Sequence, residues 1–569
     1  MIGAVTQRDE FGARCVSTQD HQHSSAHLIM HAPAGRSPRR RLVTAVASVT
    51  IALALTLNPL DAQRTTPGDA AGFGDLAAGP YKRLVIRGAM VIPGHGGPPA
   101  GPYDIVIEGN TITEMIAFDP VTAARRGRTE RPTGDRVIEA AGMYVMPGMF
   151  DLHTHIRTQP MPLSYVYYLK LAMGVTTMVP ASDRGVDSAL TQAELSRQNR
   201  ILAPRLYPLV SWGGGTRFSR ADIDDPARAP EIAKAMAARG IRVISMDSNG
   251  WSADLVRAIA SAAKPNGQIT SFHIPPATTA VVNAVQAACA GVTMIEHHYG
   301  YAESALPRRV QDFGPEYSFG NELQRFRYAG KVWLEADRAK LLGAVADSLV
   351  KCGVTMLPTR VVYEANRDAV RAMSLPWHEK YTHPALWNWN LPNPDNHGAY
   401  HADWTSDDEY NWTQAYRLWG DLIFAFNQKG GRVAFGTDDN YIWATPGFST
   451  VREAQLMRET GMHNLEVLKA ATLSSANTLG VPKLGLVRPG YLADLLIVDG
   501  NPAANLKLLY AFGDLVRGAD GVVTRTRGIV HTIKDGIVLE NANLMRDVEI
   551  MVREAKKSMP MDVVRAPWK

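Results

Sequence analysis

The sequence predicts an α/β chain in which a (β/α)8 TIM barrel is joined to a small β-sandwich domain built from both chain ends. Two observations lead to this prediction. Between residues 149 and 478, eight short apolar runs alternate with helix-forming stretches. Short β-rich runs separated by Gly and Pro fill residues 81–148, and the same texture returns over residues 479–545. We therefore expect the two ends to pair and enclose the barrel.

The barrel strands follow from the apolar runs. The first ends "MFDLHTH", and the next six contain "VTTMVP", "RLYPLV", "IRVISM", "QITSFH", "VTMIEHH" and "VTMLPTR"; the eighth is "RVAFGTDD". Most are followed by a stretch with helical periodicity. The spacing fails once, at an irregular insert over residues 364–415 that is rich in Trp, Pro, Asn and Asp. A long irregular insert is typical of a lid or binding loop. Its Trp residues favour an aromatic or apolar small-molecule substrate held by stacking. The alternative is that its Trp side chains pack the lid or a contact in a homo-oligomer.

The first 62 residues resemble an export leader. Basic residues from Arg36 to Arg41 precede an apolar run from Leu42 to Leu57, and small residues end near Ala62. This predicts a signal peptide of the Sec type, with a weak twin-arginine match, and a periplasmic or secreted protein. An uncleaved anchor is the alternative, and Met30 is an alternative start. Residues 63–80 read as a linker, and residues 546–569 as a C-terminal tail.

Charge and cysteine content restrict the partners and the redox chemistry. A formal net charge of +5 over 569 residues does not favour nucleic acid as a partner. Cys15 lies in the leader, so Cys289 and Cys352 are expected as buried free thiols rather than as a disulfide framework, with one bridge between them as the alternative.

Imidazoles and a carboxylate end several barrel strands. Because active-site residues of such barrels lie at the C-terminal ends of strands, we expect a metal site there. Its candidate ligands are His153, His155, His273, His297 and Asp438. His153 and His155 are two residues apart and face the same side of a strand. His298 points away from His297, so only one of that pair is expected in the site. This donor set suits Zn²⁺ or another divalent cation, and Asp438 is placed to act as the acid/base on an attacking water.

These motifs, together with "LGLVRPGYLADLLIVDGNP", resemble the amidohydrolase superfamily, especially its imidazolonepropionase-like and prolidase-like branch. The resemblance covers residues 82–538. It implies the five metal ligands above and a catalytic role for Asp438. Binuclear members have a carboxylated Lys at the end of strand four, where this chain has Ser245. One reading is a mononuclear centre in which His297 faces the substrate as a catalytic residue. The other is that Asp247 substitutes for the missing carboxylate and two ions bind. The mononuclear reading is favoured.

The resemblance also guides the predicted reaction. Related deaminases have a Glu soon after the strand-five His, and "FHIPPATTA" has none. We therefore expect a metal-dependent hydrolase of a non-nucleobase amide bond in a peptide-like or N-acyl small molecule. An ester, lactone or carbamate hydrolase and a catalytically degenerate binding protein are the alternatives. Trp212, Arg217, Tyr299 and Tyr363 are the candidate substrate residues, with Arg217 as a carboxylate clamp.

Overall fold

The computed structural model describes residues 70–119, 121, 125, 130–157, 160–307, 313–391, 393, 396–401 and 403–561. The predicted leader and residues 63–69 of the predicted linker lie outside the described residues. Within the described part of the chain, no helix combines the length and the apolar character needed to cross a membrane.

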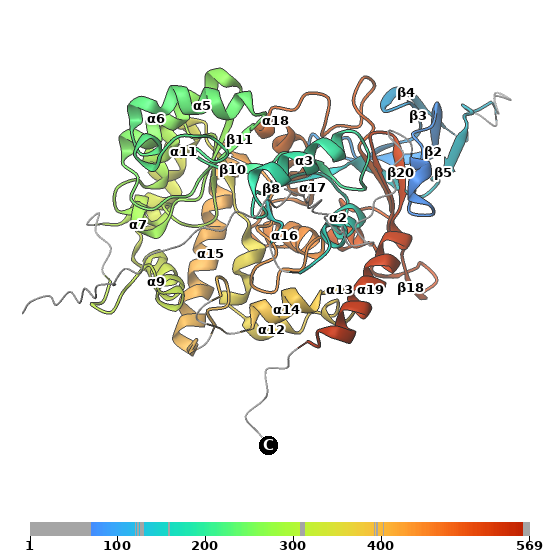
Figure 1. Ribbon diagram of the computed structural model, residues 1–569. Coiled ribbons are helices and arrows are strands. Elements are labelled where there is room, and N and C mark those ends of the chain that lie inside the picture. Colours follow the sequence, from blue (N-terminus) through green and yellow to red (C-terminus); the bar gives the residue numbers. More distant parts are fainter. Residues whose placement is uncertain are drawn as a thin grey trace, which may run out of the picture. The chain divides into compact units, whose positions relative to one another are not determined.

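Eight parallel strands form the sheet that carries the candidate site (Figure 1). In spatial order they are β7 (Met149–His155), β8 (Val175–Ala181), β10 (Leu209–Ser211), β11 (Val243–Met246), β12 (Ile269–Phe272), β13 (Met294–Glu296), β14 (Thr355–Leu357) and β15 (Arg432–Val433). A short strand, β9 (Arg205–Leu206), pairs with β8. Backbone hydrogen bonds from Leu152 N to Phe435 O (2.8 Å) and from Thr437 N to His153 O (3.0 Å) join the first strand to the last, as ring closure requires.

Alternating side chains explain why these strands are apolar throughout. One cluster contains a residue from or next to every strand: Phe150, Val179, Leu209, Val243, Ile269, Met294, Leu357 and Ala434. Their neighbours, such as Val210, Ile244 and Met356, belong to a different cluster that includes the surrounding helices. Successive side chains of a strand point to opposite faces, and a parallel sheet is buried on both.

Helices separate the parallel strands, as predicted. They include α2 (Leu163–Ala172), α3 (Val186–Arg197), α5 (Ala229–Ala238), α6 (Ala253–Ala263), α8 (Ala284–Cys289), α9 (Glu322–Glu335), α11 (Ala346–Cys352), α15 (Ser406–Gln428) and α16 (Phe448–Glu459). α15 begins with a capping box between Thr405 and Asp408, which satisfies free N–H groups of its first turn.

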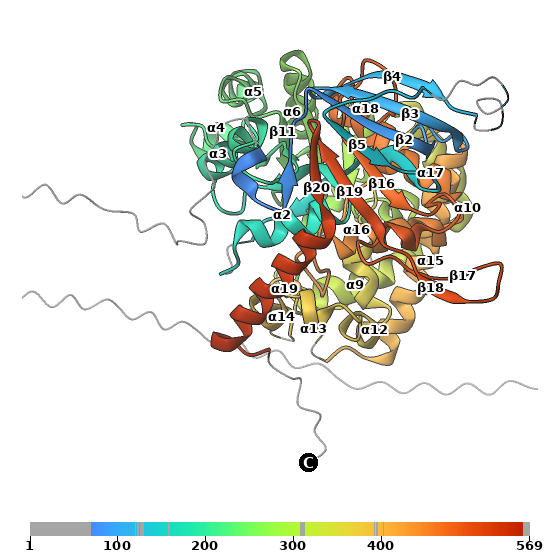
Figure 2. The same ribbon diagram turned by 90° about the vertical axis from the view of Figure 1, so that its right-hand side faces the viewer.

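The two chain ends pair in a second sheet (Figure 2). Its path is β1 (Ala77–Ala78), β20 (Ile537–Glu540), β19 (Gly528–Lys534), β16 (Leu495–Asp499), β6 (Tyr144–Pro147), β2 (Arg83–Val91), β3 (Ala100–Glu108) and β4 (Thr111–Ala117), and β5 (Arg136–Glu139) pairs with β2. β16 and β6 are antiparallel, with Leu495 opposite Pro147. The strands form one sheet, so the predicted two-layer sandwich is not confirmed.

The second sheet is attached to the barrel through α2. Thr532 donates its hydroxyl hydrogen to Leu171 O (2.8 Å), and the Asn541 amide donates to Ala172 O (2.8 Å). These bonds satisfy carbonyls at the helix end. Asn541 begins α19 (Asn541–Ser558), so a large part of the predicted C-terminal tail is helical.

The predicted insert is largely helical. It contains α12 (Ala369–Met373), α13 (His378–Tyr381) and α14 (Pro384–Asn390), and the last two contact α19 (Figure 1). Trp377 stacks on Phe448 with ring centroids 5.0 Å apart. Trp412 lies in α15 and donates its indole N–H to Phe326 O (2.8 Å). These Trp side chains pack the helices around them.

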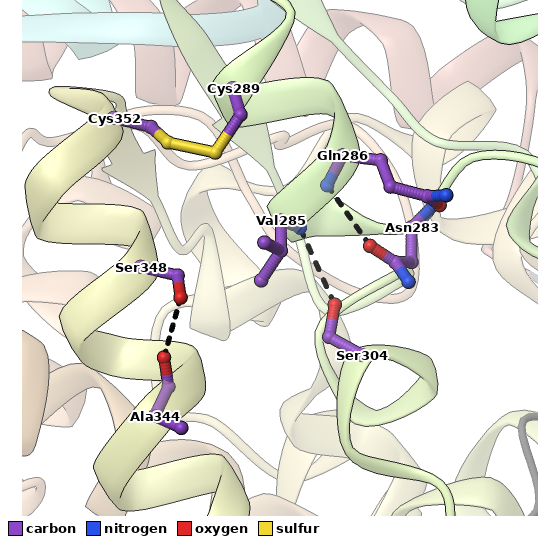
Figure 3. The surroundings of a disulfide bond; sticks show 8 residues. All are labelled: Asn283, Val285, Gln286, Cys289, Ser304, Ala344, Ser348 and Cys352. Atoms are coloured by element: carbon purple, nitrogen blue, oxygen red, sulfur yellow. Dashed lines mark hydrogen bonds between the residues drawn. A yellow bond between two sulfur atoms is a disulfide. The ribbon is translucent and has the colours of Figure 1, made fainter.

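Cys289 and Cys352 form a disulfide that joins the ends of α8 and α11 (Figure 3). The prediction of free thiols is therefore wrong. The two residues are 63 apart in sequence but their Cα atoms lie 4.9 Å apart, within the range that a disulfide needs. Only the packing of two consecutive barrel helices brings them together.

Candidate metal centre and active site

A cavity of about 470 Å³ lies at the C-terminal ends of the barrel strands. Polar lining residues come from or after each strand in order, and they include His153 and His155, Asp183, Ser211, Ser245 and Asp247, His273, Glu296 and His297, Tyr363, and Asp438. All eight strands therefore contribute to one site, the position where barrel enzymes carry their catalytic groups.

Asp438 is the point at which three imidazoles meet. Its Oδ1 lies 3.2 Å from His153 Nε2 and 3.2 Å from His155 Nε2, and its Oδ2 lies 3.5 Å from His297 Nδ1. A register shift in β7 between Asp151 and Thr154 accompanies this arrangement. Bulges of this kind commonly re-aim side chains beside active sites.

A buried ionic cluster holds the loop that carries Asp438. Lys170 of α2 is fully buried; its ammonium lies 2.6 Å from Asp151 and also pairs with Asp439. Asp151 accepts hydrogen bonds from the backbone N–H (3.0 Å) and hydroxyl (2.7 Å) of Thr437. The residues on both sides of Asp438 are therefore tied to β7 and α2.

Two carboxylates outside the predicted ligand set orient the β7 histidines. Asp183, after β8, is hydrogen-bonded to His155 Nδ1 (3.0 Å). Glu296 Oε1, at the end of β13, lies 3.0 Å from His153 Nδ1. In both rings the Nε2 atom is left facing Asp438. Carboxylates that hold the second ring nitrogen of a histidine fix the tautomer of a metal ligand. Sequence reasoning missed both roles, although "IEHH" places Glu296 beside a candidate ligand.

The end of β13 resolves the choice between the two adjacent histidines. His297 has φ of +58°, a left-handed turn that lets both Glu296 and His297 line the cavity. His298 packs against aromatic rings instead, with centroid distances of 5.1 Å to Trp412 and 5.8 Å to Trp419.

The charges of the site oppose the cost of burial. Burial lowers the pKa of His155, but Asp183 and Asp438 outweigh it and raise that pKa to about 9. Burial raises the pKa of Asp438, but His297 and His153 hold it well below its usual value. Burial dominates at His297 and lowers its pKa to about 4. Asp438 is thus held ionised by the imidazoles around it.

The predicted substrate residues divide into two pairs. Tyr363 lines the cavity, and Tyr299 lies behind it, with its hydroxyl 3.4 Å from Arg325 Nε. Trp212 is buried and donates its indole N–H to Ile223 O (3.1 Å), and Arg217 is exposed.

Neither Trp212 nor Arg217 lines the cavity. Trp212 directly follows Ser211, so its side chain points to the face opposite Ser211, and Arg217 lies beyond the Gly-rich turn of residues 213–215. The arginine that does line the cavity is Arg325 of α9, which sequence reasoning missed.

The donor set fits a divalent cation. Within the described part of the chain, two groups bring metal-binding atoms within 4.8 Å of one another: His153, His297 and Asp438; and His273, Glu296 and His297. Imidazole and carboxylate are ligands that Zn²⁺ and similar ions accept. Ser245 lines the cavity, and its hydroxyl lies 3.3 Å from Asp247 Oδ2, which also accepts a hydrogen bond from Ser211 (2.9 Å). Asp247 belongs to neither group.

Comparison with known proteins finds a family match in one segment of the chain and a shared fold over most of it. Residues 421–539 match the Amidohydrolase family. The solved structure of a Xaa-Pro dipeptidase with methionine bound in the active site superposes with a TM-score of 0.53 at 18% identity, covering 80% of this chain and 100% of that one. The resemblance to the amidohydrolase superfamily is thus confirmed: the matched segment is of that family, and the fold is one that amidohydrolases share.

Two curated relatives match shorter stretches. Adenine deaminase 2 of Agrobacterium fabrum (strain C58) is 30% identical over 164 residues, which are 24% of this chain and 27% of the relative. N-acyl-D-aspartate deacylase of Alcaligenes xylosoxydans xylosoxydans is 27% identical over 244 residues, 39% of this chain and 45% of the relative. The chain therefore matches less than half the length of these relatives.

Proposed function

We propose that this protein is an exported, metal-dependent hydrolase of an amide bond in a peptide-like or N-acyl small molecule. The observation that carries the proposal is the convergence of three imidazoles on the buried Asp438 at the floor of a cavity of about 470 Å³. The N-acyl-D-aspartate deacylase and the Xaa-Pro dipeptidase both have names that denote amide hydrolysis, which supports the same reaction class.

In the proposed reaction Asp438 moves the proton. His153, His155, Asp438 and the strand-five and strand-six histidines would hold the cation, which when bound supplies Lewis acidity toward water and the substrate carbonyl. Asp438 accepts a proton from the attacking water as its oxygen adds to the carbonyl carbon. The same carboxyl group then gives the proton to the amide nitrogen as the C–N bond breaks, which releases a carboxylic acid and an amine.

The wall of the cavity beside His273 is suited to a substrate anion. Arg325 is half-buried beside Tyr299 and Phe326, and its only carboxylate partner within ion-pair distance among the described residues is Glu322, at 3.6 Å. A guanidinium can bind a carboxylate through two parallel N–H bonds. We infer that Arg325 receives the carboxylate of an N-acyl amino acid or dipeptide, the role that the sequence had suggested for Arg217.

Export is supported by two independent features. The leader has the layout of a signal peptide. The Cys289–Cys352 disulfide is of a kind that persists in oxidising compartments such as the periplasm.

Metal content and hydrolysis test the proposal together. Purified protein should contain bound divalent metal, hydrolyse members of an N-acyl amino-acid and dipeptide panel, and lose activity in EDTA. Asp438→Asn should keep the fold and lower kcat by at least about 10²-fold, the lower range for a general acid/base. Activity that survives metal removal would contradict the proposal, and matched amide and ester substrates would separate amide from ester preference.

Hydrolytic deamination is the second candidate, because the Agrobacterium fabrum relative is named as an adenine deaminase. The sequence has no Glu soon after His273, but the structure places Glu296 beside it. Ammonia release from adenine and related aminopurines, with no turnover of N-acyl amino acids, would favour this candidate.

A further inference from the structure

A second cavity, larger than the one at the metal centre, lies among the helices outside the barrel sheet. Its volume is about 660 Å³, against about 470 Å³ for the active-site cavity, and among the described residues the two share no lining residue. Side chains of α8 and α11 line it, and the Cys289–Cys352 disulfide joins these two helices (Figure 3). Cavities of this size are typical of small-molecule sites. The proposed hydrolysis makes no use of it.

Bonds within the fold hold the walls of this cavity in place. The disulfide fixes α8 against α11, with the two Cα atoms 4.9 Å apart. Val285 of α8 donates its backbone N–H to Ser304 Oγ (3.4 Å), and that hydroxyl donates to Gly300 O (2.7 Å) (Figure 3). Ser304 belongs to η4 (Ala302–Ala305), a short 3-10 helix after β13. The cavity is therefore formed before a ligand arrives, which lowers the entropic cost of binding.

One cationic and one acidic side chain line the cavity. Lys340 ends α10 (Arg338–Lys340); its Nζ lies 3.5 Å from Leu306 O, and within the described part of the chain no carboxylate is within ion-pair distance of it. Glu303, three residues before Leu306, accepts a hydrogen bond from Gly300 N (2.8 Å). Burial raises the pKa of Glu303 to about 7, so a neighbouring ammonium group would favour its ionised form.

The rest of the lining is uncharged, as far as the structure describes it. Its apolar side chains include Val281, Val285, Leu306 and Val345. Val281 is 50% exposed although it lines a cavity. A ligand with an apolar part would remove this surface from water, which is favourable.

We propose that this cavity binds a free α-amino acid with an apolar side chain, whose carboxylate pairs with Lys340 and whose ammonium group pairs with Glu303. An α-amino acid carries one charge of each sign, as the lining does. A dicarboxylate or a phosphate would place like charges beside Glu303, which costs free energy. The inference goes beyond the proposed hydrolysis and does not depend on the metal centre.

Equilibrium dialysis of the purified protein against radiolabelled leucine tests the inference. Lys340→Met should raise the Kd for leucine by roughly 10–100-fold, because a charged hydrogen bond is lost. Lys351→Met is the matched control: Lys351 is exposed on α11 and does not line the cavity, so it should bind leucine as the wild type does. N-acetyl-leucinamide, in which both charges are blocked, should not compete.

Two further variants place the bound leucine. Arg325→Met removes the cation of the active-site cavity and should keep the binding that Lys340→Met loses. Ala344→Trp fills the second cavity from an exposed position of η5 (Leu341–Val345) and should abolish binding without changing a charge.

The outcomes separate this inference from the proposed function. No binding of leucine, equal Kd values for Lys340→Met and Lys351→Met, or binding that only Arg325→Met removes would each overturn the inference, even if the enzyme is active. Hydrolysis plays no part in these measurements, so an inactive protein that binds leucine as described would support the inference and remove the proposed function alone.

Discussion

At the scale of single residues, backbone conformation decides which side chains reach the site. Asp438 and His297 both adopt positive φ, +52° and +58°. Such conformations cost of order 1–3 kcal/mol for non-glycine residues and cluster at functional sites. At Asp438 the cost is offset by the hydrogen bond from its N–H to His153 O (2.7 Å). The left-handed turn is thus part of how the carboxylate is aimed at the imidazoles.

Arg325 provides a test of substrate recognition. Replacing it with Met should raise KM for carboxylate-bearing substrates by about 10–100-fold, because a charged hydrogen bond is worth about 1.5–3 kcal/mol. Substrates whose carboxylate is blocked as an amide should be unaffected. Steady-state kinetics on such substrate pairs measure the effect.

Arg217→Met is the matched control for this substitution. Arg217 is exposed and does not line the cavity, so its loss should leave KM unchanged. Equal effects of the two substitutions would contradict the assignment of Arg325.

Glu453 predicts a pH dependence of stability. It is fully buried on α16, accepts a hydrogen bond from Val361 N (2.7 Å), and has its pKa raised by burial from 4.5 to about 8. The folded state therefore binds this proton more tightly than the unfolded state. Stability should be greatest below the unfolded pKa, fall as the pH rises toward 8, and level off above it; the loss is on the order of a few kcal/mol.

Glu453→Gln should remove this part of the pH profile, because the amide stays neutral at every pH. Thermal unfolding of wild type and variant between pH 5 and about pH 9 measures the difference. Parallel profiles for the two proteins would show that Glu453 does not titrate in this range.

At the scale of elements, α2 connects the site to the second sheet. Its Lys170 binds Asp151 of β7 and Asp439, the neighbour of Asp438, and its C-terminal carbonyls accept bonds from β19 and α19. One helix therefore sets both the position of the Asp438 loop and the place of the second sheet.

Lys170→Met should destabilise the protein by about 3–5 kcal/mol, the cost of leaving buried carboxylates unpaired. It should also lower kcat, because the loop holding Asp438 loses its anchor. The control is Lys429→Met: that lysine pairs with Asp347 at 2.7 Å on the surface and should cost less than about 1 kcal/mol. Denaturant unfolding compares them, and equal losses would contradict the argument.

At the scale of the whole molecule, the disulfide is a long-range restraint. It links α8 to α11 (Figure 3). The two cysteines are 63 residues apart, and the segment between them includes β13 and α9, which carry the cavity residues Glu296 and Arg325. Replacing both Cys289 and Cys352 with Ala should lower the free energy of unfolding by about 2–5 kcal/mol. Reductant should lower the melting temperature of the wild type and leave the double variant unchanged; insensitivity of the wild type would show that the bridge does not stabilise the fold.

The sequence was sufficient for the strands and for the residues that end them. The parallel order of the sheet follows from eight apolar runs separated by helices, and His153, His155, His273, His297 and Asp438 all line one cavity as expected. Arg325 and Asp183 could not be found in this way. They come from a helix and a loop whose distance from the site depends on how the chain packs.

The sequence by itself determined the class of fold, the ends of the barrel strands and the imidazole and carboxylate donors that gather there, because strand periodicity and residue chemistry are local properties. The tertiary structure decided which neighbours complete the site. In the structure Glu296 lies beside His273 and His297, and Arg325 rather than Arg217 lines the cavity. His298 does not line the cavity, Cys289 is bonded to Cys352, and the two chain ends pair in one sheet. These contacts depend on how distant segments pack and on left-handed backbone turns at single residues. The pattern of residues along one strand specifies neither.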